Sequence, residues 1–513
     1  MTVRTAPNGA DETEPLLPGV NTPTRPINSQ AKKFMILLMC GIFVLAADFG
    51  NDLGLAPQTE IFEQIICRKH EVNSSGAKDP SWGNPCKSEA VQGELALVLG
   101  YKDMFEVLPS ILLSLPYGIL SDHWGRKPVI YLGVVGMLVG EIWVRLVALW
   151  SGVLPLRLVW LTGLFRVIGG GDQVVVSIAL VMVADIFDEE ERSTALFRLQ
   201  SCITLAEVMA TPVSAFLMGY SIWLPYILGL VVMVIGSIPI LFLPETLEEA
   251  KAKKRASRLR SGTESPMVSS EPADLTGKPA VVQDLIRQIE EFKNSTRFIW
   301  RDRNIWLLVL CLFVTVMTRQ TNNVLLQYVS KKFDWSIAQA SLLISLRGFF
   351  ALANYLVIMP GLTFILAKYC NLHGKLRDRS MSQGSGIFSI IGFLAVGFAP
   401  VPSLLICGMV FMSMGSAFHI TLRSLGTGLV SPVHVGTLYS AMTISISLGL
   451  FIAGPLFAYL FRLGMHFGGP WMGLPFLQGG LFFVMAVVAV SYIRVRRPSS
   501  FSGQSEEEEP LLS

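Results

Sequence analysis

The chain has 513 residues, of which 51% are hydrophobic and 15% are charged, and its mean hydropathy is +0.52. An ordinary soluble domain carries about 25% charged residues, so this composition excludes a soluble globular protein and predicts a membrane protein. The formal net charge of +3 gives no indication of a nucleic-acid partner, because membrane topology accounts for the basic residues.

Apolar segments long enough to cross a bilayer, at about 20 residues each, recur along the whole chain and predict an all-α membrane protein. The first six begin near Phe34, Leu99, Val129, Leu158, Thr194 and Ile222, and a second set begins near Ile305, Ala338, Ser382, Ser403, Gly436 and Met472. The composition therefore divides the chain into a disordered N-terminal tail (1–33), a first half (34–244), a linker (245–303), a second half (304–494) and an acidic tail (495–513).

The linker is rich in Ser, Pro and charge up to Lys278, which is typical of a disordered tether. Over 281–300 the apolar residues follow a helical period and predict an amphipathic helix at the membrane surface. Lys and Arg residues such as Lys33, Arg126 and Lys375 concentrate on the side that both tails share. By the positive-inside rule, we expect both termini and the linker to be cytosolic.

A short polar turn separates the second and third apolar segments, and it reads Gly118-Ile119-Leu120-Ser121-Asp122-His123-Trp124-Gly125-Arg126-Lys127. This decapeptide resembles the G-x-x-x-D-x-x-G-R-[RK] signature of the loop between helices 2 and 3 in the major facilitator superfamily. His123 stands where the family usually has a basic residue. The resemblance implies twelve transmembrane helices in two pseudo-symmetric six-helix halves and transport by alternating access.

Three further stretches are similar to family patterns. Arg166 and Gly170 match the helix 4 pattern, although Gly169 replaces its usual Gln. Residues 184–192 resemble the turn after helix 4, and residues 243–246 resemble the end of helix 6. The long first external loop and the central linker are most similar to fungal members. The family's cytosolic latch, a group of charges that braces the closed cytosolic side, would comprise Gly118, Asp122, Gly125, Arg126, Lys127 and Asp185. For Lys127, membrane topology alone is an equally good explanation.

Ionisable residues inside the spans carry the most functional information, because each is costly in hydrocarbon and should face a cavity or a partner. In the first half these are Asp48, Asp52, Glu106, Glu141, Arg145, Arg166, Asp172 and Glu207. In the second half they are Arg319, Arg347, His419 and Arg423, with no acid. Glu141 and Arg145, four residues apart, are expected to form a structural pair, and His419 is expected to be a packing residue.

This asymmetry admits two interpretations: the acids bind protons while the arginines bind substrate, or the two sets neutralise each other across the cavity. We assign proton coupling or gating to Asp48, Asp52, Glu106, Asp172, Glu207 and Arg319. The dense polar run after Arg319 predicts a cavity-lining face. We assign the substrate cavity to Arg166, Arg319, Gln320, Asn322, Asn323 and Arg347.

Aligning the two halves places Asp48 of the first helix on Arg319 of the seventh, its symmetry mate. Both lie in the outer half of the bilayer, which predicts that they pair across the halves and close an outer gate. The alternative is that each charge pairs within its own half, for example Asp48 with Arg145 or Arg166.

The external loop between the first two spans contains Cys67 and Cys86, which predict a disulfide in an oxidising compartment. Asn73 begins an Asn-Ser-Ser glycosylation sequon in the same loop. Each tail carries an acidic dileucine pattern that sorting adaptors read, at Leu16-Leu17 and at Leu511-Leu512. Vacuolar and plasma membranes are equally favoured locations.

The sequence shows no metal-ligand spacing, phosphate-cradling loop or nucleophile triad, so we expect no enzyme, metal or cofactor. Without an ATP-binding motif, a gradient must supply the energy. We therefore predict a monomeric secondary active carrier of a small organic molecule that is coupled to protons, with export of a metabolite or toxicant as the first hypothesis. Uptake of an organic anion is the second, suggested by the second-half arginines and a similarity to folate-type carriers. A nutrient sensor on a transporter scaffold is a third, which the short tails disfavour.

Overall fold

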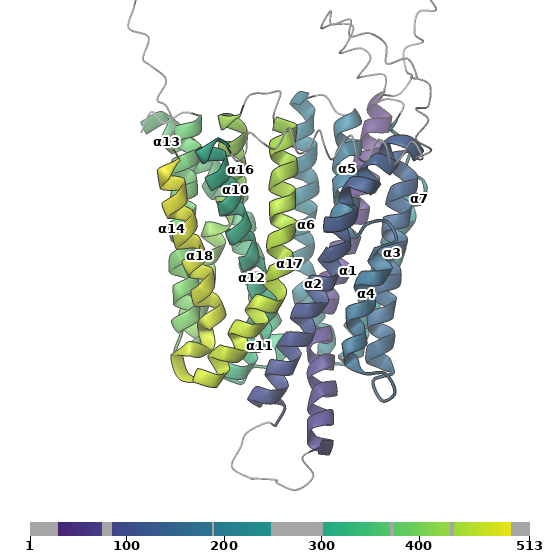
Figure 1. Ribbon diagram of the computed structural model, residues 1–513, viewed down its shortest axis with the longest axis vertical. Coiled ribbons are helices and arrows are strands. Elements are labelled where there is room, and N and C mark those ends of the chain that lie inside the picture. Colours follow the sequence, from purple (N-terminus) through teal and green to yellow (C-terminus); the bar gives the residue numbers. More distant parts are fainter. Residues whose placement is uncertain are drawn as a thin grey trace, which may run out of the picture.

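The structure is a computed structural model that describes residues 29–73, 85–186, 189–247, 301–369, 374–430 and 435–493. Most of the N-terminal tail, the linker with its predicted amphipathic helix, and the acidic tail lie outside these ranges. The sorting residues Leu16, Leu17, Leu511 and Leu512 are therefore not described. Figure 1 shows the described helices running side by side as a single bundle.

The first half provides helices at each of its expected positions. The first, second, third and sixth spans are single helices: α1 (Ser29–Asn73), α2 (Glu89–Trp124), α3 (Arg126–Leu149) and α7 (Trp223–Leu241). The fifth span is also a single helix, α6 (Glu189–Met218). The fourth is interrupted and consists of η2 (Leu156–Leu161), α4 (Thr162–Arg166) and α5 (Asp172–Ile186).

In the second half, three spans change helical type within the membrane. The seventh span consists of α10 (Arg303–Val316), η3 (Met317–Gln320) and α11 (Thr321–Phe333). The eighth consists of α12 (Ile337–Ala353), η4 (Asn354–Ile358) and α13 (Met359–Tyr369). The tenth consists of α15 (Pro402–Met414), η5 (Gly415–Ala417) and α16 (Phe418–Leu429). The others are α14 (Lys375–Phe398), α17 (Val435–Phe467) and, after the 3₁₀ turn η7 (Gly469–Gly473), α18 (Leu474–Tyr492). Nine segments of the described chain are long and apolar enough to cross a membrane.

We call the face at which α1 begins and α18 ends the terminal face, and the opposite one the disulfide face. They are the top and bottom of Figure 1. The 45 residues of α1 span about 68 Å at 1.5 Å each, more than twice the hydrocarbon core, and its end projects from the disulfide face. The first helix is thus much longer than predicted, and Asn73 is its last residue. The second helix starts at Glu89, ten residues before the predicted start at Leu99.

The first half has two clusters of buried apolar side chains, one near each face. The cluster toward the terminal face includes Ile36, Val129 and Met182, and the cluster toward the disulfide face includes Phe62 and Leu95. Between these clusters along the helices lie Asp48 and Asp52 of α1, Lys102, Asp103 and Glu106 of α2, Glu141 of α3, and Arg166 and Asp172 of the fourth span, and Arg145 of α3 adjoins Val144 of the second cluster. We call this level the charged layer. The apolar pattern of each helix therefore places its charges at one common depth.

The two halves meet mainly where α2 packs on α17 and α6 packs on α12. Gly100 and Gly454 allow the first contact, because a Cβ at either position would meet the backbone carbonyl of the other. Ala96 of the first half is buried within the apolar core of the second. The halves therefore share a packed boundary toward the disulfide face.

Candidate functional site: the charged layer and its boundary with the second half

Arg166 lies at the centre of the charged layer. Its Nη2 atom is 3.2 Å from Glu141 Oε1 and 3.3 Å from Glu106 Oε2, and its Nη1 atom bonds Asp172 Oδ2. Arg145 Nη1 lies 2.7 Å from the other oxygen of Glu141, so the predicted Glu141–Arg145 pair is formed. Arg166, Glu141 and Arg145 are all buried. Buried charges persist only when they are paired, and this network supplies those partners within one half.

Three glycines make the Arg166–Asp172 contact possible. In an unbroken α-helix, residues six apart face different directions and are about 9 Å apart along the axis. Gly169, Gly170 and Gly171 have φ values of +87°, +80° and +82°, which interrupt the helix, and α5 restarts at Asp172. Tyr117 Oη holds the interruption by accepting a 2.9 Å bond from Gly169 N and donating a 3.0 Å bond to Val167 O. The departure from the family pattern at Gly169 is therefore part of a broken helix.

Two charged residues that the sequence analysis did not include complete the layer. Lys102 Nζ is 2.8 Å from Glu106 Oε1 and 3.9 Å from Asp103 Oδ1. The second span was predicted to start near Leu99, so both residues lay at its predicted end. The apolar run from Leu95 to Leu99, together with the four-residue spacing of Lys102 and Glu106, could have indicated the longer helix.

Asp103 joins the charged layer to the second half. Its Oδ2 atom accepts bonds of 2.5 Å from Gln320 Nε2 and 2.7 Å from Asn323 Nδ2. The network has three bases, Lys102, Arg145 and Arg166, and four acids, Asp103, Glu106, Glu141 and Asp172. Asp103 is the acid of this network that also bonds the opposite half.

A second polar connection joins α6 to α12. Arg347 Nη2 bonds Glu207 Oε1 across the halves, and its Nη1 donates a 2.8 Å bond to Asn322 Oδ1. Ser345 Oγ donates a 2.6 Å bond to Val208 O beside this pair. Of the predicted cavity residues, Arg347 and Asn322 therefore belong to an inter-half ion pair and its support.

A cavity of about 200 Å³ lies at the boundary beside Asp103. Both halves contribute to its lining, which consists of Asp103, Glu106, Val107, Ser110, Asp172, Gln173, Gln320 and Asn323. Gln320 and Asn323 were predicted for the cavity, and Glu106 and Asp172 were predicted for proton coupling. Arg166 bonds the cavity-lining Asp172. Arg319, Asn322 and Arg347 are not among the lining residues.

The structure does not form the predicted Asp48–Arg319 gate. Both residues are described, and no ion pair joins them, although Asp48 interacts electrostatically with Arg319, Asp172 and Glu207. Across the boundary, α1 packs on α12, whereas Arg319 lies on η3, which packs on α10, α11, α17 and α18 of its own half. Arg145 and Arg166 form ion pairs with Glu106, Glu141 and Asp172. Asp52 lies within electrostatic range of Asp48, Glu207 and Arg347.

At the terminal face, Glu245 binds the start of α3. Its carboxylate accepts bonds from Arg126 N at 2.9 Å and Lys127 N at 3.1 Å, and from the amides of the two residues that follow it. Partial burial alone would raise the pKa of Glu245, but these four amide bonds outweigh it and lower the pKa below its usual value. The sequence analysis had noted Glu245 only as the end of helix 6.

The conformation of Gly125 fits this arrangement. Its φ is +109°, and a Cβ there would meet the Glu245 carboxylate. Arg126 Nη1 donates a 2.8 Å bond to Ser121 Oγ, which in turn donates to Gly118 O. The side chains of Asp122 and Asp185 lie outside the described part of the structure, so the remainder of the predicted cytosolic latch stays a prediction.

At the disulfide face, Cys67 of α1 and Cys86 of the 3₁₀ turn η1 (Pro85–Lys87) are joined by a disulfide. The sequon beside it begins at Asn73, and its other two residues are not described. His419 packs edge-to-face on the rings of Phe418 and Phe483.

These features define a membrane transporter of two six-helix halves with polar contacts at their boundary. The sequence model of the Major Facilitator Superfamily matches residues 96–318 and 308–513, and the chain belongs to this superfamily. The MFS-type transporter avaK of Aspergillus versicolor is 34% identical over 495 residues, or 96% of this chain and 99% of that protein. The efflux pump ustT of Aspergillus flavus is 33% identical over 469 residues, or 91% of this chain and 90% of that protein.

Among solved structures, the xylose transporter XylE from E. coli, in a partially occluded inward-open conformation, has a similar fold. The TM-score is 0.55 at 15% identity, and the match covers 89% of this chain and 97% of that one. The predicted two-half fold and the resemblance to fungal members of the superfamily are confirmed.

Proposed function

We propose that this transporter exports a small amphipathic organic molecule in exchange for protons. The observation that carries the proposal is Asp103, a carboxylate that lines the cavity and bonds two amides of the opposite half. Protonation removes the charge that strengthens those bonds, so proton binding and separation of the halves are linked. The efflux pump named among the relatives supports the outward direction.

The inter-half ion pair of Glu207 and Arg347 supplies the second part of the mechanism. Charges that pair across a boundary in one state and separate in the other give two states of comparable energy. Asp52 lies within electrostatic range of both members of this pair and Asp48 within range of Glu207, and both add further groups that can bind protons. Arg319 has an exposed side chain beside Arg347.

We place the terminal face in the cytosol, on the strength of the basic residues near it, and the disulfide face in an oxidising exterior or lumen. In this orientation Asn73 is available for glycosylation. The tails can then present Leu16, Leu17, Leu511 and Leu512 to sorting adaptors, which would direct the protein to the vacuolar rather than the plasma membrane. Glycosidase treatment of the wild type and of an Asn73→Gln variant tests the orientation, because a luminal sequon gives a mobility shift that the variant lacks.

Untargeted metabolite profiling of cells and medium, with and without the protein, tests the direction. Export predicts that a compound is lower inside expressing cells and higher in their medium, and the opposite pattern contradicts it. The compound is then used in proteoliposomes. An imposed proton gradient should drive its accumulation against its own gradient, and collapse of the proton gradient should abolish that accumulation.

Uptake of an organic anion is the alternative that one observation favours. The exposed guanidinium of Arg319 beside Arg347 could bind a carboxylate or sulfate of the substrate. An Arg319→Gln variant separates the two proposals. It should raise the KM for an anionic substrate strongly but leave transport of a neutral or cationic amphipathic compound nearly unchanged.

A further inference from the structure

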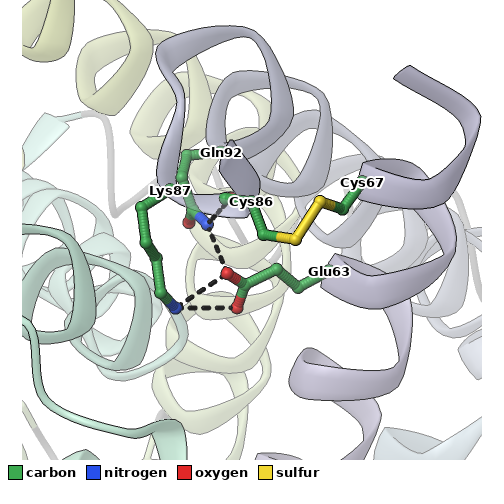
Figure 2. Close-up of a disulfide and its surroundings, with 5 residues drawn as sticks. All are labelled: Glu63, Cys67, Cys86, Lys87 and Gln92. Carbon is green, nitrogen blue, oxygen red and sulfur yellow. Dashed lines mark hydrogen bonds and ion pairs between the residues drawn. A yellow bond between two sulfur atoms is a disulfide. The ribbon is translucent and has the colours of Figure 1, made fainter. Parts of the chain in front are cut away.

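A single helical turn, η1, is attached to the long first helix at the disulfide face. The Cys67–Cys86 bond closes 19 residues of sequence and fixes η1 against α1, with the Cα atoms 5.0 Å apart. Gln92 of α2 adds a second attachment by donating a 3.0 Å bond to the carbonyl oxygen of Cys86. Lys87, the last residue of η1, therefore starts from a defined position (Figure 2).

The ammonium group of Lys87 contacts both halves of the protein. Its Nζ atom lies 2.7 Å and 3.0 Å from the two carboxylate oxygens of Glu63 on α1, in its own half. The same atom donates a 2.6 Å bond to Ser330 Oγ on α11, in the other half. In the opposite direction, Lys331 Nζ donates to the backbone carbonyl oxygen of Lys87. One residue thus makes two hydrogen bonds across the boundary.

The partners of Lys87 are arranged so that these two bonds can break at low cost. When the halves separate, Lys87 keeps its ion pair with Glu63, which Gln92 Nε2 also holds through a 3.0 Å bond. Ser330 keeps its 2.7 Å bond to Trp335 O. The Lys331 ammonium would be released into the opened, hydrated space. No buried charge is left without a partner, so the closed and open states remain close in energy.

We propose that Lys87, positioned by the Cys67–Cys86 disulfide, holds the two halves together at the disulfide face while that face is closed. Its two bonds to the second half break when the face opens. We call Glu63, Lys87, Ser330 and Lys331 the Lys87 bridge. The inference rests on the proposed alternating-access function. It adds a gating residue and assigns the disulfide the task of holding that residue at the boundary. If the disulfide is absent, η1 loses its attachment to α1 and the bridge is weakened.

Ala96 provides a reporter for the opening of this face. It is 3% exposed and lies on the same side of α2 as Gly93 and Gly100, which approach Arg462 and Gly454 of α17. An Ala96→Cys thiol should therefore react with a maleimide only when α2 and α17 separate. The native thiol of Cys311, wholly buried in the core of the second half, serves as the control in a separate protein.

The experiment uses purified full-length protein in which the reporter is the sole free thiol, so that the disulfide remains intact. Lys87→Met, Ser330→Ala and Lys331→Met should each raise the maleimide reaction rate of Ala96→Cys by about tenfold, because each removes a charge-assisted bond across the boundary. In a matched protein in which Cys311 is the sole free thiol, the rate should stay low. General loosening of the fold would raise both rates and would contradict the proposal.

Lys332 offers a matched control, because it is the neighbouring lysine and its Nζ bonds Tyr328 Oη on its own helix, 2.7 Å away. Lys332→Met should leave the Ala96→Cys rate unchanged. Equal rates in Lys331→Met and Lys332→Met proteins would overturn the bridge. Ser330→Ala provides an independent reading if Lys87→Met does not fold, since it retains the Lys87–Glu63 pair.

The role of the disulfide is tested with a Cys67→Ser, Cys86→Ser double variant. Its Ala96→Cys rate should rise as in Lys87→Met, and adding Lys87→Met to it should give little further increase. An unchanged rate in the folded double variant would contradict the role of the disulfide. The labelling rates do not depend on transport, so the bridge can stand even if proton-coupled export is refuted by the proteoliposome assay.

Discussion

The carboxylate of Asp103, in the first half of the chain, accepts a 2.7 Å hydrogen bond from the amide of Asn323, in the second half. This contact, together with the one from Gln320, places an acid of the charged layer directly on the surface along which the halves must move. In the mechanism that we propose, its protonation state and the position of the halves are therefore linked.

Asp103→Asn should separate exchange from proton coupling. The asparagine can still accept a bond from Gln320 or Asn323 but cannot bind a proton, so substrate counterflow should persist while gradient-driven accumulation is lost. The measurement is radiolabelled substrate movement in proteoliposomes, with and without a pH gradient. Asp334→Asn is the matched control, because Asp334 lies in the turn after α11 with φ of 54°, which Asn also tolerates. Gradient-driven transport at the wild-type rate in Asp103→Asn would refute the assignment.

Glu207 and Arg347 should behave as a pair in a double-mutant cycle. Glu207→Gln and Arg347→Gln should each lower the transport rate by about tenfold, since each leaves one charge at the boundary without its partner. The exchanged variant, Glu207→Arg with Arg347→Glu, should recover part of that loss. Arg379→Gln is the control, because Arg379 bonds the carbonyl oxygen of Ser491 within the second half. Additive effects in the cycle would show that the two side chains act separately.

Gly169→Ala should destabilise the interrupted fourth span. The positive φ disfavours alanine, and its Cβ would meet the backbone of Gly133 on α3, so the free energy of unfolding should fall by about 1–3 kcal/mol. Thermal unfolding of the purified protein gives the measurement. Gly41→Ala on α1, where a Cβ meets nothing within 4 Å, should keep or raise the midpoint. The same midpoint in both variants would contradict a requirement for glycine at position 169.

The contribution of Glu245 should depend on pH. Because its pKa is lowered in the folded protein from the usual 4.5, the ionised carboxylate stabilises the fold fully above that value. The stabilisation is lost as the pH falls below about 4.5 and through the lower folded pKa. The difference in unfolding midpoint between wild type and Glu245→Gln should therefore be constant near pH 7 and shrink toward pH 3. A difference that grows on acidification would contradict the sign of the shift.

Hydropathy and one decapeptide predicted the fold class and the order of the spans, because the bilayer requires about 20 apolar residues for each crossing. The ends of the helices were harder to predict. The second span was started near Leu99, ten residues after its helix begins, so Lys102 and Asp103 stood at its predicted end and were missed. The triple glycine at 169–171 was recognised as a departure from a motif but not as a break.

The Asp48–Arg319 gate stays a prediction, because internal symmetry shows which positions correspond but not which helices touch. Across the boundary α1 packs on α12, and α11, which follows Arg319, packs on α2. Gln320 and Asn323, whose polar run predicted a cavity-lining face, line the cavity beside Asp103. Their bonds to Asp103 depend on tertiary packing, which one sequence does not reveal.

The two apolar clusters of the first half flank the charged layer on its two sides, and the cavity beside Asp103 lies at the boundary with the second half. In the transport cycle that we propose, the acids should therefore exchange protons with whichever compartment that boundary admits. The timing of proton loading would then require no moving part inside the first half. It is set by the pH of the two compartments and by the opening of the boundary, so proton leak and substrate slippage should share a single structural cause.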